Sequence, residues 1–485
     1  MPGNLPYDPA DAQSIYRYAL GLQQKSLRQV LGDGVEQAVA AMNERDKGDF
    51  GKLVEKLYFL YENNSNAEPD FPLAGLEVKT APLKQIKKGL VSKERLVFNI
   101  INYEEEAEQA FRTGSFWKKN RFLLLLFFRH EPGVPNVDYV FEIIRLWRFP
   151  DTDLKIIKDD WEKIVTKIRE GRAHELSEGD TLYLGACTKG ANKASLRTQP
   201  FSAQLAMQRA FSLKSRYLNF IIEQTRQGIE QAIDEGAYER ILHEGAIAPS
   251  VRPPDRQLQL FESVVKSVDD YAPGQTFEEL VIERFQPYIG LSKDDLLQHL
   301  GFEEIRQRLS MGVKPPKNLY HLIAKAIMGV SEEKIAEFEK GEVTMKAIRL
   351  KRNGMPKESM SFPQIQYKEI IHETWEESSW YDTLTKRFFF VVFRYDDADI
   401  LRLHKVMFWT MPSADLEVAR QFWEDTKTKI QADDYAHFIS ISDGMICHVR
   451  PKGANAQDLM ETPSGRMEKK KCYWLNASYI RDIVR

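Results

Sequence analysis

The stretch PDFPLAGLEVKT, residues 69–80, joins an acidic turn to an alternating strand pattern. Leu76 and Val78 alternate with Glu77 and Lys79, which is the period of a half-buried strand. The alternation predicts that Glu77 and Lys79 lie on one face of this strand. The two apolar side chains then turn toward a core on the other face.

An Asp followed by Glu-x-Lys on one strand face suits metal-assisted hydrolysis of a phosphodiester. Asp70 comes one short turn before the strand, ahead of a glycine that lets the chain reverse. The Asp70 and Glu77 carboxylates can hold a hard cation such as Mg²⁺, which polarises the phosphate and acidifies its bound water. The ammonium of Lys79 would hold the attacking hydroxide and offset charge in the transition state. Glu-Val-Lys also occurs on solvated strand faces without any chemistry, so the rest of the chain has to separate the two interpretations.

The composition is that of a globular protein with ample core. The chain has 485 residues, 43% hydrophobic and 29% charged, with a net charge of −3. The longest apolar run, residues 122–128, is too short for a membrane span, and no secretory signal is visible. Cys187, Cys447 and Cys472 are scattered without metal-ligand spacing, which indicates free thiols in a reducing cytoplasm. Because the net charge is not basic, any positive charge for nucleic acid must be local, in a cleft.

Helical and strand patterns alternate along the first half and predict an α/β fold, a mixed sheet flanked by helices. Helices are predicted over residues 13–20, 26–31, 35–42, 51–61, 160–169 and 213–233, and strands over 75–80, 96–101, 122–128, 140–148 and 181–186. In the helix over 51–61, the predicted apolar stripe is Leu53, Leu57, Leu60 and Tyr61, with Glu55 off that stripe.

The second half repeats the first. Matching segments keep a nearly constant offset, 269 residues between 21–32 and 290–301, 267 between Lys79 and Lys346, and 263 between the Lys-Gly-Ala-Asn at 189–192 and at 452–455. Pro and Gly signals concentrate in residues 246–275. The sequence therefore predicts two tandem copies of one domain, residues 1–245 and 276–485, joined by a linker over 246–275.

The two copies differ where chemistry would lie. Thr344 stands opposite Glu77, and Ala324 stands opposite Glu55, whereas Lys346 matches Lys79. Glu337 matches Asp70, so one acidic residue remains. These oxygens are too few for tight cation binding, which predicts a second copy without catalysis. The fold evidently does not need Glu55 and Glu77, and this favours a functional role for them in the first copy.

A basic loop is retained in both copies. It reads Cys187-Thr188-Lys189 before Gly-Ala-Asn in the first copy and Arg450-Pro451-Lys452 in the second. Arg and Lys on a tight loop after a strand suit contact with guanine edges and phosphate. An ordinary basic surface turn is the alternative. Lys118 and Lys119, before the strand at 122–128, are further candidates for lining a cleft.

Together these motifs resemble the MutH/Sau-three-AI group of GATC-specific endonucleases, within the broad Pro-Asp…(Asp/Glu)-x-Lys nuclease superfamily. The matching stretches are residues 47–55, 69–70 and 77–80 and the two Lys-Gly-Ala-Asn loops. The resemblance implies a restriction-endonuclease-like fold and Mg²⁺-dependent cleavage of duplex DNA at GATC. It implies the following roles: Glu55, Asp70 and Glu77 as metal ligands, Lys79 as the residue that positions the water, Lys118 or Lys119 as a further active-site lysine, and Lys189, Arg450, Pro451 and Lys452 on the sequence-reading loop. Because Cys187-Thr188 departs from the Arg-Pro of that loop, Arg197, Gln199 and Ser212 are candidates to compensate.

We therefore expect a cytoplasmic type II restriction endonuclease of the IIE-like kind, in which the N-terminal domain is catalytic and the C-terminal domain is an allosteric second-site DNA binder. One centre per chain cuts one strand, so we expect a monomer in solution that dimerises on DNA. Two alternatives remain open. A MutH-like strand-nicking endonuclease of mismatch repair predicts a nicked product. A non-catalytic DNA-binding protein, with Glu77 and Lys79 as a structural ion pair, predicts binding without cleavage.

Overall fold

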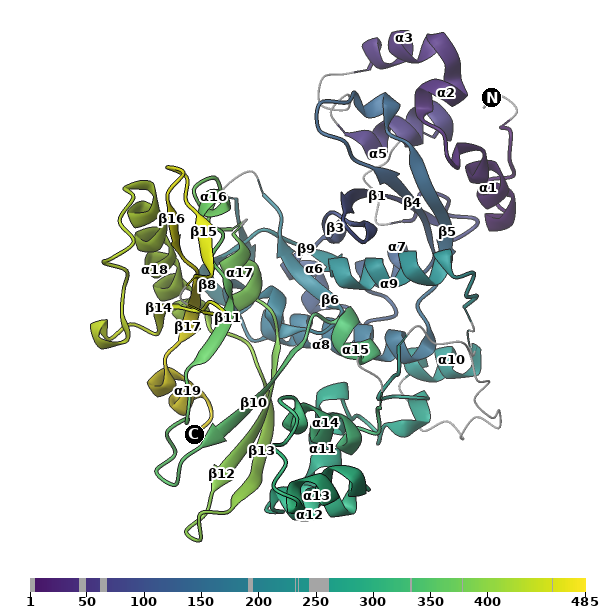
Figure 1. Cartoon of the computed structure of the whole chain (residues 1–485). Coiled ribbons are helices and arrows are strands. Elements are labelled where there is room, and N and C mark those ends of the chain that lie inside the picture. Colours follow the sequence, from purple (N-terminus) through teal and green to yellow (C-terminus); the bar gives the residue numbers. More distant parts are fainter. Residues whose placement is uncertain are drawn as a thin grey trace. The chain divides into compact units, whose positions relative to one another are not determined.

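The chain forms two compact units of mixed α/β structure, shown in Figure 1, which confirms the predicted fold class. The computed structural model describes residues 5–42, 49–61, 68–190, 195–231, 233, 235–243, 261–331, 334–376, 378–455 and 457–485. Unit 1 comprises Met1–Thr276 with Lys334–Glu342, and unit 2 comprises Phe277–Glu333 with Val343–Arg485. Among the described residues, no helix is both long and apolar enough to cross a membrane. The three cysteines are free, as predicted, and all three are buried.

Unit 1 contains a four-stranded sheet of order β2-β1-β4-β5, a three-stranded sheet of order β3-β9-β6, and the hairpin β7-β8. The strands are β1 (Glu77–Ile86), β2 (Gly89–Ser92), β3 (Leu96–Ile100), β4 (Leu123–Arg129), β5 (Phe141–Trp147), β6 (Leu184–Thr188), β7 (Leu196–Gln199), β8 (Ser202–Met207) and β9 (Arg209–Leu213). The α-helices are α1 (Ala12–Ala19), α2 (Leu27–Leu31), α3 (Val35–Ala40), α5 (Phe50–Leu53), α6 (Tyr103–Ala107), α7 (Ser115–Asn120), α8 (Asp151–Arg169), α9 (Ser215–Arg226), α10 (Glu235–His243) and α15 (Ala336–Lys340).

Unit 2 has the same plan, with sheets of order β10-β12-β13 and β11-β17-β14 and the hairpin β15-β16. The strands are β10 (Thr344–Leu350), β11 (Met360–Gln364), β12 (Phe388–Tyr395), β13 (Leu401–Trp409), β14 (Cys447–Pro451), β15 (Leu459–Glu461), β16 (Met467–Lys469) and β17 (Lys471–Leu475). The α-helices are α11 (Phe277–Phe285), α12 (Lys293–His299), α13 (Glu303–Ser310), α14 (Leu319–Ile327), α16 (Tyr367–Ile370), α17 (Ser379–Leu384), α18 (Ser413–Gln431) and α19 (Ala477–Ile483).

Strand register fixes the correspondence between the two copies. β1 pairs with β4 in parallel, and β10 pairs with β12 in the same way. Lys79 lies opposite Leu125, and Lys346 lies opposite Phe390, each on the third residue of its strand. In unit 1, β4 then pairs antiparallel with β5, and in unit 2, β12 pairs antiparallel with β13. Lys346 therefore occupies the position of Lys79, as the offset predicts.

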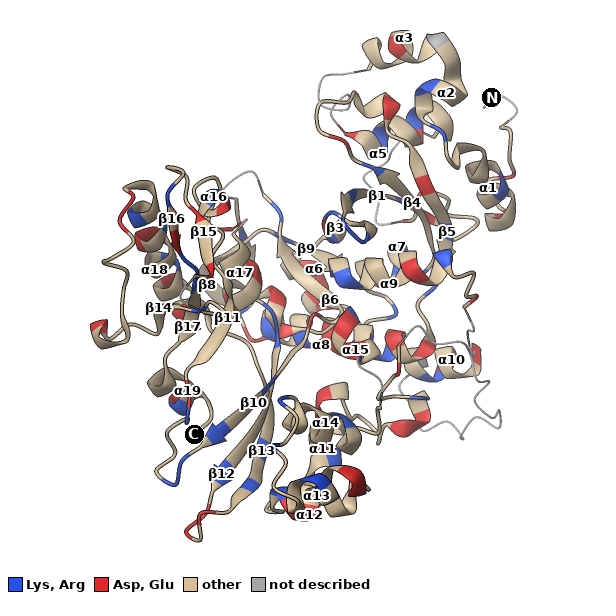
Figure 2. Cartoon of the chain, viewed as in Figure 1, with Lys and Arg blue, Asp and Glu red and all other residues tan. Residues whose placement is uncertain are grey.

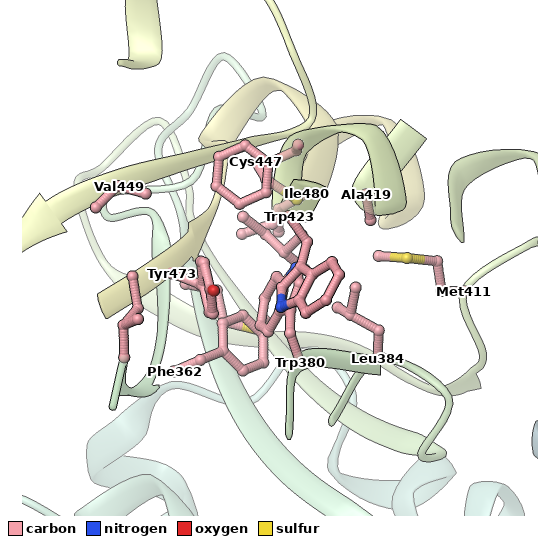
Figure 3. Packing of buried hydrophobic residues seen from close by; sticks show 14 of the residues in the cluster. Phe362, Trp380, Leu384, Met411, Ala419, Trp423, Cys447, Val449, Tyr473 and Ile480 are labelled. Carbon is pink, nitrogen blue, oxygen red and sulfur yellow. The ribbon is translucent and has the colours of Figure 1, made fainter. Parts of the chain in front are cut away.

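A dense aromatic core holds the second sheet of unit 2. Figure 3 shows Phe362 of β11, Trp380 of α17, Trp423 of α18 and Tyr473 of β17 in this cluster. The rings of Trp380 and Tyr473 stack with their centres 4.5 Å apart. Buried aromatic pairs of this kind contribute packing beyond their area, so β11 and β17 form a rigid support for the residues on their open side.

The predicted helix over 51–61 differs from the structure. α5 ends at Leu53, and a π-helix covers Val54–Tyr58. A π turn closes with an i→i+5 hydrogen bond, so the apolar stripe shifts by one residue. Val54 and Tyr58 are buried, whereas the predicted stripe residue Leu60 is 59% exposed at a φ of +56°.

The strand that carries Glu77 is not half-buried. β1 lies between β2 and β4 inside its sheet, and the Glu77 side chain is as buried as its apolar neighbours, at 1% exposed. Several predicted bounds are also wrong. The strand predicted over 75–80 is Glu77–Ile86, and the strand predicted over 181–186 is Leu184–Thr188. The helix predicted over 213–233 ends at Arg226. Leu213 ends strand β9, so the helix begins only at Ser215, and α8 begins at Asp151, directly after Pro150. A proline before the first helical residue suits such a start, since it has no N–H to satisfy.

Candidate active site

A tight hairpin brings Asp70 beside the start of β1. Phe71 and Leu76 exchange backbone hydrogen bonds of 2.9 and 3.2 Å, and Gly75 takes a φ of +63° in the turn between them. This is the left-handed region that glycine enters without strain. The Asp70 N–H then donates to Glu77 Oε2 at 3.0 Å, and the Val78 N–H donates to Asp70 Oδ2 at 2.9 Å. The hairpin therefore fixes the two carboxylates next to each other.

Two lysines contact the other oxygen of Glu77. Lys79 Nζ lies 2.5 Å from Glu77 Oε1, and Lys119 Nζ, on α7, lies 3.6 Å from the same oxygen. Lys118, its neighbour on α7, is exposed. Of the two lysines that the sequence left open, the structure brings Lys119 into the cluster.

Glu55 lies on the π-helix, and its Oε2 is buried without a hydrogen-bond partner. Burial, followed by the repulsion of Asp70, raises the pKa of Glu55 to about 7, although the Lys79 ammonium opposes this shift. Burial also raises the pKa of Glu77. For Lys79, burial lowers the pKa, but the Glu77 carboxylate and its hydrogen bond outweigh that effect, and the net direction is upward. A lysine held cationic beside strained carboxylates is typical of a catalytic site.

These residues fit a hard divalent cation. Carboxylate oxygens are the donors that such ions prefer, and a cation would satisfy the orphaned Glu55 oxygen. Within the described ranges, no three acidic, histidine or cysteine side chains already converge closely enough to enclose a metal ion. The donor chemistry is therefore present, with Glu77 Oε1 engaged by Lys79 in the arrangement seen here.

The corresponding positions of unit 2 lack these acids. Thr344 begins β10 where Glu77 begins β1, and Ala324 is buried in α14. Glu337 does not lie with Lys346 in unit 2. It belongs to α15 of unit 1, where its oxygens accept the N–H groups of Val264 and Val265, both at 3.0 Å. Its carboxylate thus serves the backbone rather than a cation site.

The DNA-reading candidates of unit 1 are Lys189 on the turn after β6, Arg197 and Gln199 on β7, and Ser212 on β9. Lys189 and Arg197 are exposed, and Arg197 Nε donates to Gln208 Oε1 at 2.8 Å. Residues 191–192 of the Lys-Gly-Ala-Asn loop lie outside the described residues. Gln199 and Ser212 are buried, and Gln199 Oε1 accepts the Ala173 N–H at 2.7 Å, so neither side chain is available to a base.

The reading loop of unit 2 rests on an aromatic ring that the sequence did not single out. The Arg450 guanidinium lies 4.5 Å from the ring centre of Trp474 on β17, and Lys452 Nζ lies 5.7 Å from it. Lys452 Nζ also donates to Ser361 Oγ on β11 at 2.7 Å. Pro451 is exposed beside them at the end of β14. No spacing rule links Trp474 to Arg450, since the contact depends on the pairing of β14 with β17.

Comparison with known proteins confirms the resemblance and the duplication. The family described as the DNA mismatch repair enzyme MutH matches residues 59–160 and again residues 328–421, an offset of 269 at the start and 261 at the end. The type II restriction enzyme Sau3AI of Staphylococcus aureus is 32% identical, over 93% of this chain and 94% of its own length. The DNA mismatch repair protein MutH of Shewanella woodyi is 27% identical over 45% of this chain and 93% of its own, and that of Buchnera aphidicola is 23% identical over 37% and 81%.

Proposed function

The chain belongs to the family of MutH-related type II restriction enzymes, and we propose that it cleaves duplex DNA at GATC with Mg²⁺, using unit 1 for catalysis and unit 2 as an allosteric second-site binder. Family membership makes it a restriction endonuclease, a site-specific hydrolase of DNA. The observation that carries the division of labour is the cluster of Asp70, Glu77 and Lys79 in unit 1. Its counterpart in unit 2 keeps only the lysine.

In the proposed mechanism Glu55, Asp70 and Glu77 would hold a divalent cation, which when bound would supply polarisation of the phosphate and acidification of water. Lys79 positions the attacking water and offsets the charge that develops on the phosphate. Lys119 shares Glu77 Oε1 with Lys79 and keeps that carboxylate oriented. In hydrolysis the water oxygen bonds to phosphorus, one ester P–O bond breaks, and the departing oxygen takes up a proton.

DNA contact is proposed for residues of α7 and for residues on and around the reading loops of the two units. They are Lys118, Lys119, Lys189 and Arg197 in unit 1 and Arg450, Pro451 and Lys452 in unit 2. Exposure of Arg450 on the Trp474 ring supports a role in base recognition, because a stacked guanidinium keeps its donor edge free for guanine. We propose that the chain is a monomer in solution and that two chains meet on the cleavage site.

A plasmid digest tests this function. Substrates carry zero, one or several GATC sites, and wild type is compared with Glu77→Ala and Arg450→Ala. We expect the wild type to leave site-free plasmid whole and to cut multi-site plasmid fastest. Glu77→Ala should bind but not cut, and Arg450→Ala should lose the advantage of several sites.

The matches to mismatch repair enzymes favour one second candidate, a strand-nicking repair endonuclease. It predicts that nicked circles accumulate on hybrid methylated–unmethylated duplex and that linear product does not form. Linear product from unmodified plasmid would exclude this candidate. Binding without any cut, in Mg²⁺ and in every methylation state, would contradict both.

A further inference from the structure

Three cations of unit 2 gather where unit 1 has its acidic centre. Lys346 Nζ lies 5.3 Å from the ring centre of Phe362, and Lys452 Nζ lies 3.5 Å from the Phe362 carbonyl oxygen. Arg450 stands on the neighbouring Trp474 ring. Phe362 and Trp474 lie on β11 and β17, which pair in one sheet. Figure 2 shows β10, which carries Lys346, among the strands of unit 2 that bear basic residues.

The same strand position has opposite surroundings in the two units. In unit 1, Lys79 is paired with Glu77, and Asp70 and Glu55 also favour its charge. In unit 2, no ion pair to a carboxylate is found for Lys346, Arg450 or Lys452 within the residues that the structure describes. The carboxylate that pairs with the lysine in unit 1 has no counterpart in unit 2, whereas the lysine is retained.

A partly buried ammonium without a carboxylate partner is unfavourable in this position. Lys346 is only partly exposed, and burial together with the Lys452 ammonium lowers its pKa. A partly desolvated cation beside a second cation gains free energy when an anion enters. The rings of Phe362 and Trp474 lie against the charged ends of these side chains, Phe362 against Lys346 and Trp474 against Arg450 and Lys452. Cations gathered in this way suit a phosphate group.

We propose that the degenerate centre of unit 2 is a phosphate-binding site, in which Lys346 and Lys452 hold one backbone phosphate of a duplex while Arg450 faces a base edge. This inference rests on the proposed second-site role of unit 2 and identifies the atoms that would carry it. Since the site offers cations where unit 1 offers carboxylates, this phosphate is bound without a metal ion and is not cleaved.

Lysine labelling tests the site directly in the full chain. Acetic anhydride acetylates exposed amines, and mass spectrometry reports each lysine separately, with EDTA present so that no strand is cut. We expect a GATC duplex to protect Lys346 and Lys452. Lys429, already paired with Asp425 on α18 at 2.7 Å, is the matched control and should react equally with and without DNA. Equal labelling of Lys346 in both states overturns the proposal.

A parallel arm uses inorganic phosphate alone. Protection of Lys346 by the duplex at concentrations where inorganic phosphate gives none identifies DNA as the source of the phosphate group. Protection by inorganic phosphate as complete as that by DNA would identify a free-anion site and overturn the DNA assignment.

Two variants separate charge from packing. Lys346→Ala removes the cation, whereas Thr344→Glu restores an acid beside an intact Lys346, as Glu77 does for Lys79. Both should weaken binding of the second duplex per chain and lower the slope of log affinity against log salt by about 0.9, the value for one lost phosphate contact. Lys346→Arg should retain the slope. Unchanged slopes for both Lys346→Ala and Thr344→Glu would overturn the site.

The outcomes also separate this inference from the proposed function. Protection of Lys346 without any multi-site preference in the digest supports the phosphate site and contradicts the allosteric role. Multi-site preference together with an unprotected Lys346 supports the allosteric role and contradicts the phosphate site.

Discussion

One lysine in each unit shows how neighbours decide chemistry. Lys79 and Lys346 occupy the same place in the same strand pairing. Lys79 is paired with Glu77, so its positive charge is offset within a group of carboxylates that fits a metal ion and water. Without the acid, Lys346 presents net positive charge to whatever enters. In our proposal, Thr344 in place of Glu77 and Ala324 in place of Glu55 distinguish an anion site from a site for hydrolysis.

Lys119 and Lys118 are adjacent but have different roles in the structure, which gives a matched pair of variants. Lys119 lies 3.6 Å from Glu77 Oε1, and its removal frees that carboxylate to reorient. We expect Lys119→Ala to lower the cleavage rate about 10- to 100-fold, the range for partners of ligating groups. Lys118→Ala, whose side chain is exposed, should affect DNA affinity at most. Initial rates at saturating DNA check this, and equal losses in both variants would contradict it.

Glu55 predicts a pH dependence of metal activation. Burial, followed by the repulsion of Asp70, raises its pKa to about 7 against the opposing effect of Lys79. A carboxylate must be ionised to bind Mg²⁺. The Mg²⁺ concentration for half-maximal cleavage should therefore rise about tenfold per pH unit below this pKa. Glu55→Gln should show weak activation with a flat profile. Activation by Mg²⁺ that does not change with pH in the wild type would contradict this role.

The same pKa has a consequence for stability, with a definite sign. In the metal-free chain, Glu55 is protonated up to about pH 7 when folded but only to its ordinary value of 4.5 when unfolded. The folded state then binds the additional proton, so the free energy of unfolding should fall as the pH rises through this window. Denaturation in EDTA should show this fall in wild type and a smaller one in Glu55→Gln.

At the scale of elements, the sequence predicted the positions of strands better than it predicted how deeply each strand is buried. The alternation around Glu77 predicted a strand over residues 75–80, which overlaps β1 (Glu77–Ile86). It could not show that β1 lies between β2 and β4, with α7 bringing Lys119 to Glu77. That burial depends on pairings made by distant parts of the chain. Periodicity reports one strand at a time.

Two further features of the site had no local signal. The π-helix over Val54–Tyr58 reads as an ordinary helix in sequence, because the inserted residue changes the hydrogen-bond pattern and not the composition. Trp474 supports Arg450 only through the pairing of β14 with β17. By contrast, the Asp70 turn was predictable, since Gly75 supplies the positive φ that the reversal needs.

Asp160 gives a prediction at the level of α8 and β6. It is 1% exposed, and its oxygens accept the N–H groups of Leu182, Tyr183 and Leu184 at 2.6–2.9 Å. Asp160→Ala leaves these buried donors unpaired and should destabilise unit 1 by about 3–5 kcal/mol. Asp159→Ala, which removes the i,i+4 ion pair with Lys155 rather than the acceptor of three buried backbone N–H groups, should cost less. Thermal melting of the full chain compares the two, and equal shifts would contradict the role of Asp160.

At the scale of the whole molecule, duplication was the most predictable property, because it depends on order along the chain and not on side-chain placement. The sequence offsets fall from 269 to 263, and the family matches show 269 and 261. What each copy does depends on very few positions. A fold that is preserved by its core tolerates the loss of Glu77 and Glu55, since neither belongs to the apolar clusters of the units.

One catalytic centre per chain leads to a prediction about assembly. If two chains meet on a site and each cuts one strand, an equimolar mixture of wild type and Glu77→Ala forms mixed pairs that cut only one strand. We expect nicked circles to accumulate from a plasmid in this mixture and not with wild type alone at the same active concentration. If one chain instead makes both cuts in succession, adding Glu77→Ala should only slow the formation of linear product. Gel analysis of the plasmid forms over time distinguishes these results. The control replaces Glu77→Ala with Arg450→Ala, a chain that is altered outside the catalytic centre and keeps the catalytic residues.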